Sequence, residues 1–115
     1  MSDFYDLEER CFEFARRVKE LIKSCRMTIT NASIADQLMD SSGSVGANYI
    51  EANEGLSKKD FVYRVRISKK ESKESRFWLR LLDCEPKDQE EQKYLIREAT
   101  ELMLIFAGIL RKCIN

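Results

Sequence analysis

Serine, cysteine and carboxylate side chains are the groups in this chain that could perform catalysis, because the sequence contains no histidine. Ser44 lies in Gly43-Ser44-Val45-Gly46, which lacks the spacing of a hydrolase G-x-S-x-G turn, and a serine nucleophile would have no imidazole base. Glu71 and Glu74 are three residues apart, but di-iron bundles use Glu-x-x-His pairs. The sequence therefore predicts no catalytic residue, no metal site and no cofactor.

The four cysteines, Cys11, Cys25, Cys84 and Cys113, form no C-x-x-C pair. Three of them, Cys11, Cys25 and Cys113, fall on apolar helical stripes, where a free thiol behaves as a small hydrophobic group. Reduced cysteines are typical of a cytoplasmic protein. The first residues lack the features of a signal peptide, and the longest apolar run, Leu102 to Leu110, is far shorter than a membrane span. We expect a cytoplasmic protein with no membrane partner.

Polar residues replace apolar ones in the middle of two predicted helices. Small or amide side chains stand on the core-facing lines at Ser41, Asn48, Ser68, Ser72 and Ser75. Glu71 falls between Ile67, Ser75 and Trp78 on a helical wheel, so its carboxylate needs a partner. This pattern predicts a structural polar network formed by Asn48, Glu71, Ser72 and Ser75, or an edge or interface position for the same residues.

A concentration of positive charge marks residues 58–80, with nine basic and three acidic side chains, whereas residues 28–57 carry a charge of about −4. Basic and aromatic side chains share one helical face there: Lys59, Tyr63, Arg66, Lys70, Lys73, Phe77 and Arg80. Cations that contact phosphates and aromatic rings that stack on bases are typical of RNA and single-stranded DNA binding. A solvated helix face, or a surface that meets an acidic helix of a neighbouring subunit, would give the same pattern.

A run of small residues occupies the middle of the preceding helix. Side chains this small let another helix approach closely, either within the bundle or in a neighbouring subunit. The residues predicted to serve this packing or assembly are Ser44, Val45, Gly46, Ala47, Asn48 and Glu51.

Four helices must position these groups, and we expect them at about residues 6–27, 32–54, 58–82 and 88–113. Apolar residues recur in steps of three and four along the first and last helices, which is typical of bundle helices. Ser33 with Asp36, and Ser57 with Asp60, have the spacing of helix N-terminal caps. Short connections favour a single domain over residues 1–115: an all-α, antiparallel, up-and-down, left-handed four-helix bundle.

Several motifs resemble one known family. Ser44-Val45-Gly46-Ala47-Asn48-Tyr49-Ile50-Glu51-Ala52 is similar to the family's S-[VI]-[GP]-A-N-x-x-E-[AG] segment. Glu71-Ser72-Lys73-Glu74-Ser75-Arg76-Phe77-Trp78-Leu79 resembles its E-x-x-E-[ST]-x-[YF]-W-L segment. The family comprises the proteins of 23S ribosomal RNA intervening sequences, called S23, and it is related to the accessory variability protein of diversity-generating retroelements.

The resemblance implies an antiparallel four-helix bundle that assembles as a ring-shaped homopentamer. For the retroelement relatives it also implies binding to nucleic acid and to a reverse transcriptase. We therefore expect a non-catalytic homo-oligomeric binding module that contacts RNA or DNA through residues 58–80. The alternative is an oligomeric scaffold for a protein partner that binds no nucleic acid.

Overall fold

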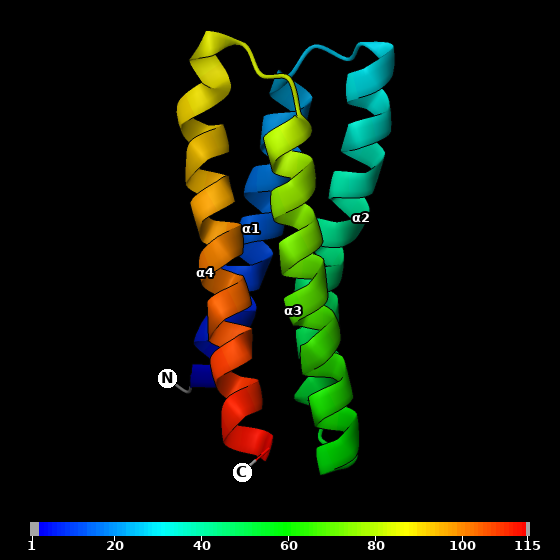
Figure 1. Cartoon of the computed structure of the whole chain (residues 1–115), viewed down its shortest axis with the longest axis vertical. Helices are drawn as coiled ribbons and strands as arrows, with labels where there is room; N and C mark the ends of the chain where they lie inside the picture. The colour runs from blue at the N-terminus through cyan, green and yellow to red at the C-terminus, as the bar shows by residue number, and fades with distance from the viewer. Residues whose placement is uncertain (1–2, 115) are drawn as a thin grey trace.

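The computed structural model describes residues 3–114, and the side chains of residues 6–113. Four long helices account for most of this part of the chain: α1 (Asp3–Ser24), α2 (Ile29–Ala52), α3 (Lys58–Leu81) and α4 (Gln89–Ile114). A short 3-10 helix, η1 (Pro86–Asp88), precedes α4. Figure 1 shows that α1 and α3 run in one direction and α2 and α4 in the other. The predicted all-α four-helix bundle is confirmed.

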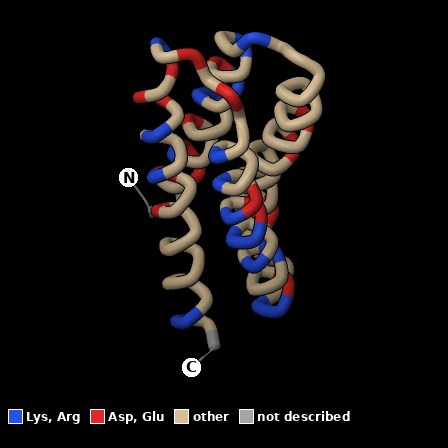
Figure 2. The backbone as a smooth tube through the Cα atoms, turned by 45° about the horizontal axis from the view of Figure 1, so that its top comes forward, with Lys and Arg blue, Asp and Glu red and all other residues tan. Residues whose placement is uncertain are grey.

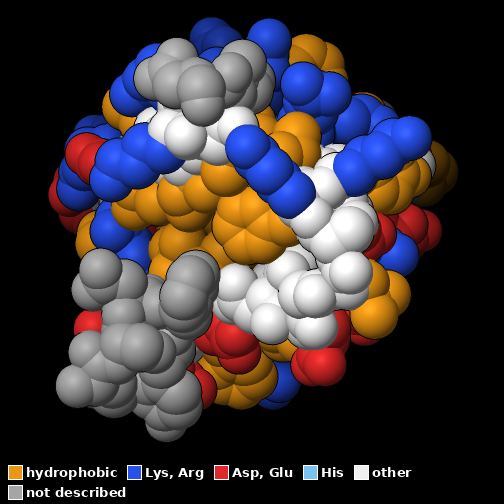
Figure 3. Space-filling view, turned by 90° about the horizontal axis from the view of Figure 1, so that it is seen from below, with side chains coloured by type: hydrophobic (Ala, Val, Ile, Leu, Met, Phe, Trp, Pro, Cys, Tyr) orange, Lys and Arg blue, Asp and Glu red, His pale blue; other side chains and the backbone are white. Residues whose placement is uncertain are grey.

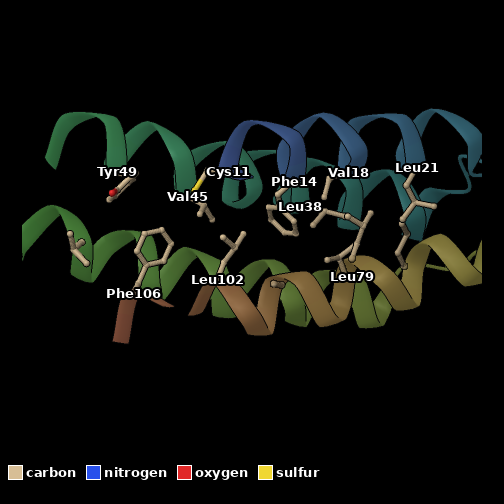
Figure 4. Close-up of a cluster of buried hydrophobic side chains, with 14 of the residues drawn as sticks. Cys11, Phe14, Val18, Leu21, Leu38, Val45, Tyr49, Leu79, Leu102 and Phe106 are labelled. Atoms are coloured by element: carbon tan, nitrogen blue, oxygen red, sulfur yellow. The ribbon is translucent and has the colours of Figure 1, made fainter. Parts of the chain in front are cut away.

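The helices form because each carries an apolar stripe that the other helices cover. Side chains at most 7% exposed follow the three-four rhythm predicted from the sequence, and those of α1 and α4 are Cys11, Phe14, Val18, Leu21, Leu95, Ala99, Leu102, Phe106 and Leu110. Figure 4 labels six of these side chains, which point into the space between the helices: Cys11, Phe14, Val18, Leu21, Leu102 and Phe106. Tyr49 of α2 packs there against Phe106, at 5.6 Å between ring centres.

Two hydroxyl side chains begin α2 and α3. The Ser57 hydroxyl accepts a hydrogen bond from the Asp60 backbone N–H at 3.0 Å, as its spacing predicted. The predicted start of α2 was wrong: Thr28, and not Ser33, caps the helix by accepting from the Asn31 N–H at 3.2 Å. The helix consequently begins three residues earlier than predicted, and the connection from α1 occupies residues 25–28.

The turn between α2 and α3 is short because Gly55 adopts a positive φ of 68°, a conformation that costs glycine little. This turn makes α2 and α3 antiparallel neighbours. Their contact is formed by small buried serines, which let the two backbones lie close together. Ser68 donates to the carbonyl of Val45 at 2.8 Å, and Ser75 donates to Ser41 at 3.0 Å.

Asn31, which is 1% exposed, joins the two connections at the upper end of the bundle. Its amide nitrogen donates to the carbonyls of Arg26 and Asp83, and its amide oxygen accepts from the Asp83 N–H, all at 2.9 Å. Beside it, the sulfur atoms of Cys25 and Cys84 lie 3.5 Å apart as free thiols. A single buried amide therefore ties the α1–α2 connection to the α3–α4 connection.

Ion pairs link α1 to α4. Arg10 binds Glu98 with two hydrogen bonds of 2.8 Å, and Arg17 binds both oxygens of Glu91 while lying 3.8 Å from the centre of the Tyr94 ring. The hydrogen bond from Arg17 lowers the pKa of Glu91. The basic residues of α1 are thus largely engaged with carboxylates on α1 and α4.

Candidate nucleic-acid interface

The predicted basic and aromatic residues of α3 lie on one exposed face of that helix. All seven are exposed: Lys59, Tyr63, Arg66, Lys70, Lys73, Phe77 and Arg80. The opposite face of α3 is buried through Val65, Ser72 and Leu79, which fixes the orientation of the helix. Figure 2 shows the basic positions crowded along the lower part of α3, beside the nearly uncharged C-terminal half of α4.

Among the described residues, no carboxylate forms an ion pair with the basic side chains of this face. Seven of the nine basic residues of α3 are exposed, while Arg64 and Arg76 are partly buried and hydrogen bond to Asn48 and Thr100. Within the described part of the chain, no basic side chain of α3 lies within 4.0 Å of a carboxylate oxygen, whereas Arg10, Arg16 and Arg17 of α1 all do. The exposed cations of α3 are therefore available to an anionic partner.

The neighbouring helix extends the positive surface. From Leu102 to Ile114, α4 contains no acidic residue and two basic ones, Arg111 and Lys112. A groove of about 440 Å³ separates this half of α4 from α3, with an apolar floor at Ala107 and Leu110. Its cationic lining consists of Arg66, Lys69, Lys70, Lys73 and Arg111.

A second hollow, of about 540 Å³, adjoins the groove at Arg66 and is lined by Lys58, Lys59, Val62 and Tyr63. Figure 3 views the lower end of the molecule, where basic side chains surround an exposed hydrophobic area on one side. Together the two hollows and the α3 face form what we call the basic surface.

The predicted face did not include three basic residues of this surface, Lys58, Lys69 and Arg111. Lys69 lies to one side of the predicted face, toward α4. Arg111 lies in the last turn of α4, where a basic residue complements the helix dipole, so its position in the sequence does not by itself indicate a binding surface. Only the packing of α4 against α3 brings Arg111 beside Lys69 and Lys73. The absence of acidic residues after Glu101 was the signal that could have indicated it.

Two aromatic rings stand out from the basic surface. Tyr63 is 58% exposed and Phe77 is 54% exposed. The Phe77 ring lies nearly perpendicular to the Trp78 ring, at 84° between planes and 5.0 Å between ring centres. Large exposed aromatic side chains are uncommon on a surface that meets only water, and stacking on a nucleobase would cover them.

The small-residue segment of α2 serves packing within the bundle at some of its positions. Val45 is fully buried, and a Cβ placed on Gly46 would lie 3.1 Å from the Cβ of Cys11, so α1 approaches α2 closely there. Ser44 and Asn48 are half-buried toward α3. Ala47 and Glu51 are exposed and turn away from the core.

The residues of the predicted polar network fall into separate groups. Ser72 donates to the Ser68 carbonyl of its own helix at 2.8 Å, and Ser75 pairs with Ser41. Asn48 donates to the Ser44 carbonyl and hydroxyl at 3.0 and 2.9 Å and accepts from Arg64 at 3.1 Å. These contacts join α2 to α3 by local pairs.

Glu71 lies beside this second group. Burial raises the pKa of its carboxyl, and the hydrogen bond to Glu74 and the Glu74 charge raise it further, whereas Ser44 and Lys70 act in the opposite direction.

Among the described residues, no three cysteine, aspartate or glutamate side chains are placed to bind a metal ion together. Within residues 3–114, no helix has the length and apolar character of a membrane span.

Comparison with known proteins identifies the family. Residues 5–108 match the family described as 23S rRNA-intervening sequence protein, which is nearly the whole chain. The chain belongs to this family. The similarity of this chain to the accessory variability protein of retroelements stays a prediction. No curated protein matches the sequence.

A solved structure shares the fold of this intervening-sequence protein. It is the crystal structure of a protein of unknown function from the S23 ribosomal protein family of Bacteroides thetaiotaomicron VPI-5482. The two chains are 24% identical, the TM-score is 0.76, and the similarity covers 96% of this chain and 99% of the other. At 24% identity, this similarity shows that the two chains share a fold.

Proposed function

We propose that this intervening-sequence protein is a non-catalytic, homo-oligomeric binding module that contacts RNA or DNA through the basic surface. The observation that carries the proposal is the set of seven exposed basic side chains on α3 that have no carboxylate partner among the described residues. Four free thiols are consistent with action in the cytoplasm.

The physical argument rests on release of counterions. Each cation that neutralises a phosphate frees a condensed counterion, so the affinity depends steeply on salt concentration. Seven cations within the 24 residues of α3 extend over a helix length of about 36 Å, which can engage several phosphates of one strand. Net charge is zero, so the attraction comes from the arrangement of charges and not from their sum.

Salt-dependent binding tests the proposal. Fluorescence anisotropy with single-stranded RNA and DNA should show micromolar or tighter binding at 50 mM salt, with an affinity that falls as salt rises. The double variant Arg66→Glu/Lys70→Glu should lose at least about tenfold in affinity because two phosphate contacts become repulsive. Light scattering of both proteins provides the control, since an unchanged mass shows that assembly is intact.

Two outcomes would overturn this function. If the wild-type protein binds neither nucleic acid at 50 mM salt, the basic surface has another purpose. If Arg66→Glu/Lys70→Glu reduces the mass to that of a monomer, the surface is an assembly interface.

Exposed apolar side chains support the homo-oligomeric part of the proposal and the alternative scaffold function. Phe12 is 60% exposed, Leu104 is 55% exposed and Ile50 is 46% exposed, on three different helices. Interfaces between subunits or with a protein partner commonly bury such residues. A scaffold for a protein partner would bind without the salt dependence expected of phosphate contacts.

A further inference from the structure

The groove between α3 and the C-terminal half of α4 has a different character from the open face of α3. The face is the outer side of one helix, whereas the groove has walls from two helices and a floor of Ala107 and Leu110. Of its seven lining residues, five are basic and none is acidic. We infer that this groove holds the sugar-phosphate backbone of one nucleic-acid strand, an inference that rests on the proposed function and names its binding site.

Charge complementarity selects an anionic ligand with several charges. Arg66, Lys69 and Lys73 lie on the α3 wall, and Arg111 lies on the α4 wall, so cations face the groove from both sides. A Cβ on Gly108 would lie 3.6 Å from a terminal nitrogen of Arg111, which shows that the guanidinium lies back along α4. A single small anion would leave most of these cations unpaired.

The shape of the groove selects one strand and not a duplex. Packed helices lie about 8–10 Å apart, so the furrow between α3 and α4 is too narrow for both strands of a double helix. The groove continues into the hollow around Tyr63 through Arg66, and the path from Lys59 to Lys73 is about 21 Å along α3. A strand in the groove could place a base on the exposed Tyr63 ring.

The apolar floor explains why the groove would hold a sugar-phosphate backbone. The Ala107 and Leu110 side chains offer no hydrogen-bond partner, so they can contact sugar carbons without desolvating a polar group. The basic walls contact phosphates, which are the same in every nucleotide. Recognition through this groove is therefore expected to be independent of base sequence.

The test uses two charge-matched double variants of the full chain. Lys69→Glu/Arg111→Glu changes groove residues that lie outside the predicted α3 face. Arg26→Glu/Lys87→Glu makes the same change in net charge at exposed positions at the opposite end of the bundle. Each protein is titrated into a fluorescent single-stranded RNA 12-mer, a DNA 12-mer and a DNA duplex between 50 and 300 mM salt, and circular dichroism confirms that each is folded.

The groove variant should lose at least about tenfold in affinity for both single strands, and its salt slope should be smaller in magnitude by about 1.4, the value for two lost phosphate contacts. The opposite-end variant should bind as the wild type does, the duplex should bind more weakly, and inorganic polyphosphate should compete. The variant Lys59→Glu/Arg80→Glu changes two exposed residues of the predicted α3 face that do not line the groove. If the groove variant binds strands like the wild type while Lys59→Glu/Arg80→Glu does not, the groove inference fails and the proposed function stands. If the wild type binds no strand, both fail.

A third variant protects the test against misfolding. Lys69→Gln/Arg111→Gln removes the charges without introducing repulsion, and it should lose affinity to a smaller degree with the same reduction in salt slope. Preferential binding of the duplex, or polyphosphate binding without any strand binding, would overturn the inference that one nucleic-acid strand occupies the groove.

Discussion

Glu71 lies at the contact between α2 and α3, and folding raises the pKa of its carboxyl group. Its raised pKa, caused first by burial and then by Glu74, means that the folded state holds this proton more tightly than the unfolded state does. The stability that this group contributes to the fold therefore decreases as pH rises from 4.5, the ordinary pKa of the group, to the raised pKa of Glu71 in the folded protein. Above that pH range the Glu71 carboxylate makes the folded protein less stable.

The variant Glu71→Gln should be more stable than the wild type at pH 7. Removing a like-charge pair on one helix is worth at least roughly 0.2–0.5 kcal/mol. The gain should disappear near pH 4, where the wild-type carboxyl is protonated. Urea unfolding at both values measures this, with the exposed Glu51→Gln as control. A gain of the same size at pH 4 would show that charge is not its cause.

The two glycines in the middle of α2 make a matched pair for the packing of α1 on α2. Gly43 is exposed, and a Cβ there would meet nothing within 4 Å, so Gly43→Ala should raise the free energy of unfolding by about 0.8–1.0 kcal/mol. At Gly46 the same methyl group would crowd Cys11 at 3.1 Å. Gly46→Ala should therefore be at least about 1 kcal/mol less stable than Gly43→Ala. Urea unfolding measures both variants, and equal increases in their free energy of unfolding would refute the close approach of α1 to α2.

At the scale of helices and their connections, Asn31 makes the contact on which the upper end of the bundle depends. Asn31→Ala would remove three hydrogen bonds that a buried side chain makes to backbone groups of Arg26 and Asp83, and it should destabilise the protein by about 3 kcal/mol. Loss of the cap in Thr28→Ala should cost only about 1 kcal/mol. Thermal unfolding of both variants compares them, and similar losses would mean that solvent replaces the Asn31 contacts.

The helices could be predicted from the sequence because burial repeats at the helical period and hydroxyl caps act within a few residues. Ser57 was correctly predicted as a cap for this reason. The start of α2 was predicted incorrectly because Thr28 and Ser33 offer competing local signals. The partner of Asn31 lies 52 residues away at Asp83, and no local pattern contains that contact.

The basic residues of α3 could be predicted as one face, because that face depends only on the geometry of a single helix. The groove could not, because it requires the register between α3 and α4. The same limit applies to Glu71, whose neighbours Ser44 and Lys70 come from two helices. The sequence therefore predicts each helix and its apolar stripe. The residues that meet across two helices become known only from the packing of those helices.

At the scale of the whole molecule, the charges are balanced in number but separated in space. Described residues of α2 include three acidic side chains and no basic one, while α3 has nine basic and three acidic side chains. The molecule is therefore an electric dipole with no net charge. Near its isoelectric point of about 6.4, such a protein can be retained by both anion-exchange and cation-exchange resins.

The same separation affects how copies of the protein meet in solution. At low ionic strength the acidic side of one copy attracts the basic side of another, and a head-to-tail contact of this kind can repeat without closing. The Debye length is about 10 Å at 0.1 M salt, so these head-to-tail assemblies should dissociate as salt is added. A closed assembly held by apolar side chains should not dissociate. The true subunit number is thus the one that remains at high salt.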